Sequence, residues 1–147
     1  MADTQKSGGS PANREDAANP LPRFTPEQLR AIDARDPLVC VAAGAGSGKT
    51  TILVERIVKL LEEFRTQPGR ELGLDQIVAI TFTDKAAAEM KARLRRKFRE
   101  AANLANSADM HFWREMERQV DSARVSTIHA FCASILREQA LRVGLDP

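Results

Sequence analysis

The sequence predicts an α/β fold in which parallel strands are joined by helical crossovers. Three short apolar runs, each followed by an amphipathic helical pattern, indicate successive strand-to-helix units. The first run leads into a glycine-rich loop, which is typical of a phosphate-binding turn between a strand and a helix. The 147 residues are 43% hydrophobic and 29% charged, which fits one globular domain.

Residues 1–22 are small and polar, and we expect them to form a disordered tail. They hold almost no large apolar side chains, so burial could not offset the entropy lost on ordering. A helix is expected next. Thr25 suits its N-cap, Pro26 suits its first position, and Gln28 completes a capping box. We expect this helix to end near Arg35, since the following residue precedes a proline.

The first strand-to-helix unit spans residues 38–65. Residues 38–42 are apolar and partly β-branched, which predicts a buried strand, and residues 43–48 predict a loop. Residues 49–65 predict an amphipathic helix, whose apolar face holds Leu53, Ile57, Leu60, Leu61 and Phe64. This order of strand, loop and helix is the context that a phosphate-binding loop requires.

Two further units follow. Residues 77–82 predict a strand, and Thr83 predicts the N-cap of a helix whose apolar stripe holds Ala87, Met90, Leu94, Phe98 and Ala101. Residues 103–121 are polar and should be helical in part. The third unit has a strand at residues 123–126 and a helix at residues 127–142, which should bury Ile128, Phe131, Cys132, Ile135 and Leu136. Because the carboxyl ends of parallel strands share one sheet edge, the three loops should lie there.

Composition excludes several classes of protein. No apolar run approaches the roughly 20 residues that span a bilayer, so we expect no membrane segment. Cys40 and Cys132 lie far apart and form no CxxC pair, which is typical of reduced intracellular proteins. A net charge of +2 does not by itself indicate nucleic acid. We therefore expect a cytoplasmic protein.

The segment from Ala43 to Thr50 matches the phosphate-binding loop motif, except that alanine replaces the first glycine. Backbone N–H groups must wrap the phosphates of a nucleotide, which favours residues without bulky side chains. Lys49 would contact the β- and γ-phosphates and the Thr50 hydroxyl would bind Mg²⁺, which makes these two the candidate catalytic residues. The nucleotide-binding set is Ala43, Gly44, Ala45, Gly46, Ser47, Gly48, Lys49, Thr50 and Thr51. The alternative is a glycine-rich turn that binds no ligand.

One part of an ATPase is missing from the sequence. An acidic residue at the end of a later apolar strand should hold Mg²⁺. After Thr50 no strand-like run ends in an acid, since Asp75 precedes its strand and Asp146 follows only Val-Gly-Leu. We therefore expect the 147 residues to be incomplete as an ATPase.

Four segments resemble, in order, motifs of the UvrD/Rep-type superfamily 1 DNA helicases: FTPEQLRAI, VAAGAGSGKTTILVERI, ITFTDKAAAEMKARL and VSTIHAFC. They are similar to the Q motif and to motifs I, Ia and Ib. The spellings TFTDKAAAEM and STIHAFC are closer to the AddA/RecB helicase–nuclease branch. The resemblance covers residues 24–147 and implies a RecA-like P-loop NTPase fold. Residues 23–147 would then be the N-terminal part of the ATP-binding domain, with a partial sheet that ends before the Walker B motif.

The resemblance implies roles for individual residues. Gln28 matches the glutamine that contacts adenine, although its place in the capping box offers a purely structural alternative. Thr81, Phe82 and Thr83 match a segment that contacts single-stranded DNA, where an aromatic ring can stack on a base. The alternative for Phe82 is a place in the core.

Thr127 and His129 match a second DNA-contacting loop of the same family. Hydroxyl and imidazole groups at a helix start are suitable phosphate ligands. His129 and Cys132 could instead belong to a zinc site, which the small number of histidines disfavours. A catalytic Cys–His pair would lack a third group to orient it.

A run of basic residues follows the first predicted DNA-contacting segment: Lys91, Arg93, Arg95, Arg96, Lys97 and Arg99. On a helix they spread around much of the surface instead of forming one stripe. This pattern favours a solvated face over a nucleic-acid contact.

These observations predict the first part of an ATP-dependent DNA helicase or translocase that moves 3′ to 5′ in DNA repair or recombination. ATP and Mg²⁺ would be its cofactors, single- and double-stranded DNA its substrates, and another component of a helicase–nuclease complex its partner. The 147 residues alone should be inactive, because neither the Mg²⁺ acid nor an arginine finger is among them. The alternatives are another P-loop NTPase, such as a small kinase or GTPase, and a non-catalytic nucleotide- or DNA-binding module.

Overall fold

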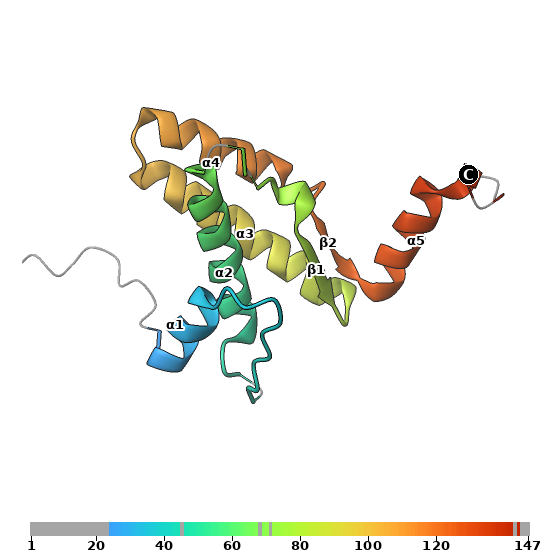
Figure 1. Ribbon diagram of the computed structural model, residues 1–147, viewed down its shortest axis with the longest axis horizontal. Helices are drawn as coiled ribbons and strands as arrows, with labels where there is room; N and C mark the ends of the chain where they lie inside the picture. Colours follow the sequence, from blue (N-terminus) through green and yellow to red (C-terminus); the bar gives the residue numbers. More distant parts are fainter. Residues whose placement is uncertain (1–23, 45, 68, 71, 143, 145–147) are drawn as a thin grey trace, which may run out of the picture.

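The computed structural model describes residues 24–44, 46–67, 69–70, 72–142 and 144 (Figure 1). The predicted tail at residues 1–22 lies outside them. The helices of this part of the chain are α1 (Pro26–Asp33), α2 (Lys49–Arg65), α3 (Asp84–Leu104), α4 (Ser107–Gln119) and α5 (Ile128–Glu138). The strands are β1 (Val78–Thr81) and β2 (Arg124–Thr127), and short 3-10 turns lie at Leu74–Gln76 and Ala140–Arg142.

Helix starts follow the predicted caps. The Thr25 hydroxyl accepts a hydrogen bond from the Gln28 amide, as the capping box requires. The Thr83 hydroxyl accepts one from the Ala86 amide at 3.1 Å and caps α3. Helix α2 begins at Lys49 and ends at Arg65, which confirms both predicted bounds.

The two strands form a parallel sheet, as the alternation of strands and helices predicts. Val78 pairs with Arg124, and the register runs on to Thr81 opposite Thr127. The chain between them forms α3 and α4, which provide the crossover that a parallel pair needs. The carboxyl ends of β1 and β2 therefore lie side by side.

The core lies where α2 and α4 pack against α3 and the sheet. Phe98 has 0% of its surface exposed and stacks on Trp113, with ring centroids 5.8 Å apart. The predicted stripe of α3 is confirmed at Ala87, Met90, Leu94 and Phe98. On α2 the buried face includes Ile57 and Leu61 as predicted, but also Val54 in place of the exposed Leu53. The face is rotated because α3 packs on that side of α2.

The predicted strand at residues 38–42 is wrong. No described residue pairs with this segment, and Leu38 is 88% exposed. A strand needs a neighbour to accept and donate its backbone hydrogen bonds, and β1 and β2 satisfy only each other here. Val39 and Val41 nonetheless keep the alternation of a strand, since both line a pocket against α2.

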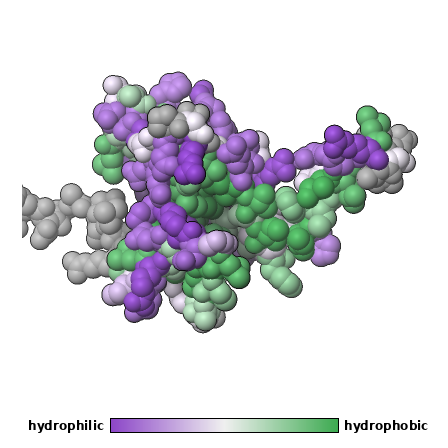
Figure 2. Space-filling view, viewed as in Figure 1, coloured by the Kyte–Doolittle hydropathy of each residue, from purple (hydrophilic) through white to green (hydrophobic). Residues whose placement is uncertain are grey.

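The predicted burial of the last helix is also wrong. None of Ile128, Phe131, Cys132, Ile135 and Leu136 is buried. Figure 1 shows α5 projecting from the body of the molecule, and Figure 2 shows apolar surface over the centre of this face and along α5. The helix also ends at Glu138, short of the predicted residue 142. The amphipathic pattern does form a helix, but no described element covers its apolar face.

This exposed apolar surface leads to a first prediction. The 147-residue chain should bind a hydrophobic dye and self-associate, because contiguous apolar patches favour both. Replacing Ile135 and Leu136 with glutamate should lower the fluorescence of the bound dye and the light scattering without lowering the melting temperature. The matched control is Leu104→Glu, a change at another highly exposed apolar position, which should leave dye binding as it is. A wild-type chain that stays monodisperse and binds no dye would contradict this prediction.

The described helices are all too short or too polar to cross a bilayer.

Candidate nucleotide and nucleic-acid site

The predicted phosphate loop has the backbone conformation that its glycines allow. Gly46 and Gly48 have φ values of 75° and 83°, in the left-handed region that side chains other than glycine seldom adopt. Gly48 is the N-cap of α2, so the first N–H groups of that helix face the loop. Ala45 lies outside the described residues. The described part of the loop therefore fits an anion-binding turn at a helix N-terminus.

Lys49 lies across this loop. Its ammonium group donates hydrogen bonds to the carbonyl oxygens of Ala43 at 2.9 Å and Gly44 at 2.6 Å. The Ser47 hydroxyl donates to the Gly44 carbonyl at 2.8 Å, which fixes the turn further. The side chain of Lys49 is exposed, so a phosphate can exchange places with these carbonyls and take the ammonium as its partner.

Thr50 lies in the first turn of α2 and is half-buried. Hydroxyl, phosphate and water oxygens are the ligands that Mg²⁺ prefers, so this position fits the ion when a nucleotide supplies the phosphates. Among the described residues, no cluster of three or more His, Cys, Asp or Glu side chains could hold a metal. The protein ligand that these residues offer is thus the Thr50 hydroxyl.

Gln28 combines both alternatives that the sequence leaves open. Its Oε1 atom accepts a hydrogen bond from the Thr25 amide at 2.8 Å, which completes the capping box. Its Nε2 atom donates to the Ser47 carbonyl at 3.2 Å and so attaches α1 to the phosphate loop. A pocket of about 310 Å³ opens beside this contact, lined by Thr25, Glu27, Gln28, Ala31, Val41, Ala42, Ala43, Ser47 and Ile52. Gln28 therefore lies where it can contact a group bound next to the loop.

The residue after Thr50 makes a contact that sequence reasoning missed. The Thr51 hydroxyl accepts a hydrogen bond from Arg93 Nη1 at 3.0 Å, and one turn later Glu55 forms an ion pair with Lys97 at 2.5 Å. Both spacings are four residues on α2 and on α3, so the two helices are joined by a matched pair of polar contacts. The spacing is visible in the sequence, but nothing in it specifies the partners.

The basic run of α3 is engaged within the chain. Arg95 pairs with Asp121, Arg99 with Glu117, and Lys91 donates to the Asp121 carbonyl. Arg96 lies near Glu100 at 3.8 Å. With the contacts of Arg93 and Lys97, these interactions join α3 to its neighbours. They support the interpretation of a structural face over a nucleic-acid contact.

The two predicted DNA-contacting segments meet at one sheet edge. The register places Thr81 opposite Thr127, and the Thr81 hydroxyl donates to the Thr83 carbonyl at 3.0 Å. Phe82 is 98% exposed, so its alternative assignment to the core is wrong. His129 is also exposed, one residue into α5. In Figure 1 the N-terminal ends of α2, α3 and α5 lie towards the same lower side of the view.

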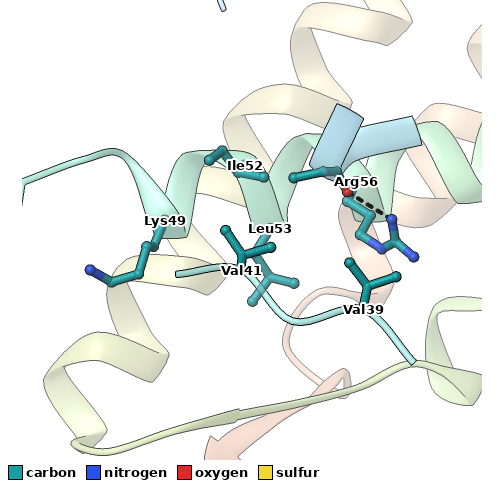
Figure 3. Close-up of a pocket in the computed structure, with 7 residues that line it drawn as sticks. Val39, Val41, Lys49, Ile52, Leu53 and Arg56 are labelled. Atoms are coloured by element: carbon teal, nitrogen blue, oxygen red, sulfur yellow. Dashed lines mark hydrogen bonds between the residues drawn. The ribbon is translucent and has the colours of Figure 1, made fainter. Parts of the chain in front are cut away.

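Arg56 is a second residue that sequence reasoning missed. It lines a pocket of about 240 Å³ with Ala31, Val39, Val41, Lys49, Ile52 and Leu53 (Figure 3). Its guanidinium donates a hydrogen bond to the Ala31 carbonyl at 2.8 Å, drawn as the dashed line in Figure 3. An arginine on the face that α2 turns towards α1 was the available signal.

Comparison with known proteins gives one family and a set of relatives. Residues 24–147 match the family model described as the UvrD/REP helicase N-terminal domain. The chain is 42% identical, over 85% of its length, to an ATP-dependent helicase/nuclease subunit from Exiguobacterium sibiricum. It is 42% identical, over 84% of its length, to the protein of the same name from Moorella thermoacetica. The matched regions cover 10% and 8% of these two relatives, so the chain spans about a tenth of their length.

Proposed function

We propose, from the premise that this chain belongs to the UvrD/REP helicase N-terminal domain family, that it is the ATP-binding part of an ATP-dependent DNA helicase. The fold we propose for the complete domain is the RecA-like P-loop fold, to which the parallel pair β1–β2 and the helices α2 and α3 would contribute. The relatives are named helicase/nuclease subunits, and we extend to this protein a role in DNA repair or recombination, a partner protein, 3′ to 5′ movement and a cytoplasmic location.

The arrangement of Lys49 supports this proposal most strongly. Its ammonium lies across a loop with two left-handed glycines, at the N-terminus of a 17-residue helix. The ammonium and the helix N-terminus both favour a bound phosphate at this place. The β- and γ-phosphates of ATP would replace the Ala43 and Gly44 carbonyls as partners of the ammonium.

Thr50 would hold Mg²⁺ through its hydroxyl. When bound, the ion would bridge phosphate oxygens and neutralise charge that develops on them. Gln28 would turn its amide towards the adenine edge, using the pocket beside the loop. In this proposal, Ala43, Gly44, Ala45, Gly46, Ser47, Gly48 and Thr51 complete the nucleotide-binding set around Lys49.

Single-stranded DNA would follow the edge where β1 and β2 end. Phe82 would stack on a base, since its ring is free of contacts that would bury it. The other proposed contacts are the hydroxyls of Thr81, Thr83 and Thr127 and the imidazole of His129. Thr83 and Thr127 are also N-caps, so backbone N–H groups at the starts of α3 and α5 would lie near the DNA phosphates.

Calorimetric titration of the 147-residue chain tests the nucleotide assignment. ATP with Mg²⁺ should bind, and GTP should bind more weakly because Gln28 would match the adenine edge. A preference for GTP would favour the alternative of a GTPase. No binding of either nucleotide would reject the proposed site.

The DNA assignment predicts the effect of Phe82→Ala. Loss of one stacked base should weaken the affinity for single-stranded DNA by about 1–3 kcal/mol. The melting temperature should stay unchanged, because the ring packs against nothing that folding buries. Fluorescence anisotropy with a labelled oligonucleotide measures the first quantity, and thermal unfolding measures the second. Unchanged DNA affinity in the folded variant would place the DNA path elsewhere.

A further inference from the structure

The C-terminal end of α1 is attached to α2 through an arginine. Arg56 Nη1 donates to the carbonyl oxygens of Ala31 at 2.8 Å and Ile32 at 3.4 Å. These carbonyls belong to the last turn of α1, where no N–H group of the helix can serve them. A cation at this end also interacts favourably with the helix dipole. The contact therefore does more than add a surface ion pair.

The opposite end of α1 is attached to the phosphate loop. Gln28 Nε2 donates to the Ser47 carbonyl at 3.2 Å, and Gln28 lies one turn before Ala31. Ile32, on the same helix, is buried. The helix is thus fixed at one end by Gln28 and at the other by Arg56.

Helix α2 connects these two attachments. Lys49 and Arg56 are seven residues apart, which is two turns, so they lie on one face of α2 and line the same pocket (Figure 3). The N-terminus of α2 carries the phosphate loop. One rigid helix therefore sets both the place of the phosphates and the place of the α1 C-terminus.

We propose that Arg56 is a positioning residue that sets where Gln28 lies relative to the phosphate loop and so determines the preference for adenine. The proposal rests on the proposed function of Gln28. A helix of eight residues is unstable on its own, so its orientation depends on such attachments. Without Arg56, the Gln28–Ser47 hydrogen bond would be left to orient the amide.

Two other contacts join the same elements, but they act on exposed side chains. Lys59 forms an ion pair with Asp33, and Arg35 donates to Glu63 at 2.6 Å. Exposed ion pairs contribute little, because water screens them and two long side chains must be ordered. They are unable to substitute for the Arg56 contact with the backbone of α1. Lys59 consequently supplies a matched control on the same face of contact.

The first test compares nucleotide binding by Arg56→Met, Arg56→Lys and Lys59→Met in the 147-residue chain. ATP, GTP and inorganic tripolyphosphate are titrated separately, each with Mg²⁺. Arg56→Met should weaken ATP binding about fivefold to tenfold, the equivalent of one hydrogen bond to the base, and leave GTP and tripolyphosphate unchanged. Arg56→Lys should retain most of the ATP preference, and Lys59→Met should retain all of it. An equal loss for tripolyphosphate would mean that Arg56 supports the phosphate loop, not adenine recognition, and would overturn the proposal.

The second test needs no nucleotide. In ¹⁵N–¹H spectra, the side-chain amide of Gln28 should be shifted and protected from exchange in the wild-type chain, and should move to the values of a free amide in Arg56→Met. The indole N–H of the buried Trp113 monitors the core and should stay in place. An unchanged Gln28 amide overturns the proposal, as does a shift of both signals, which would indicate a general loss of structure. If the wild-type chain binds no ATP, the proposed function fails, whereas this measurement still decides the role of Arg56.

Discussion

Replacing Lys49 with alanine is expected to remove most of the affinity for ATP and Mg²⁺. The ammonium is the one charged side chain that the described loop holds across its own carbonyls, and it would meet two phosphates in the complex. A charge-assisted hydrogen bond contributes about 1.5–3 kcal/mol, which corresponds to a loss of roughly 10- to 150-fold in affinity. Isothermal titration calorimetry of the 147-residue chain measures this loss directly.

The matched control for Lys49 is Lys91→Ala. Lys91 also donates its ammonium to a backbone carbonyl, that of Asp121, but on α3 and away from the loop. Both variants remove one positive charge, so a nonspecific effect of charge would weaken ATP binding equally in the two. Full ATP affinity in folded Lys49→Ala would show that the loop is a structural turn, which is the alternative that the sequence leaves open.

Replacing Phe98 with alanine is expected to have the largest effect on stability. Phe98 is fully buried between α3 and the neighbouring helices and stacks on Trp113. Removing a buried phenyl ring costs about 3–5 kcal/mol, because the apolar surface is lost and a cavity remains. For a domain of this size such a loss is a large share of the total free energy of unfolding. Urea unfolding followed by tryptophan fluorescence should show a much lower midpoint or no cooperative transition.

Phe82→Ala is the control for Phe98→Ala, because the chemical change is identical and the exposure is opposite. Phe82 directly follows β1 and is in full contact with solvent. The two variants should therefore separate cleanly, with the urea midpoint of Phe82→Ala equal to that of the wild-type chain. Equal midpoints for the two variants would mean that the described packing of α3 is not the packing in solution.

The start of α1 shows what can be predicted from neighbouring residues. A capping box depends on residues three positions apart, so Thr25 and Gln28 specify it without any tertiary contact. The same holds for the Thr83 cap of α3 and for the left-handed Gly46 and Gly48, which the loop motif requires. The candidate nucleotide site was predictable for this reason, because almost all of it lies within one loop and one helix turn.

The contacts that organise the site around that loop were not predictable. Arg56 binds carbonyls 24 and 25 residues earlier in the chain, and Arg93 binds Thr51 from 42 residues later. An arginine offers five N–H donors, and many carbonyls or acids in the sequence could accept them. Only the packing of α1 and α3 against α2 selects these partners. Gln28 illustrates both cases, since its cap was predictable and its hydrogen bond to Ser47 was not.

The amino-acid sequence by itself determined the helices, their caps, the phosphate loop and the parallel orientation of β1 and β2, because these follow from periodicity and from contacts within a few residues. Only the tertiary structure decided that residues 38–42 form no strand and that the apolar face of α5 stays exposed. The two segments have the composition of buried elements. A strand, however, exists only where a neighbour completes its hydrogen bonds, and a side chain is buried only where another element covers it. Neither condition can be read from the segment itself.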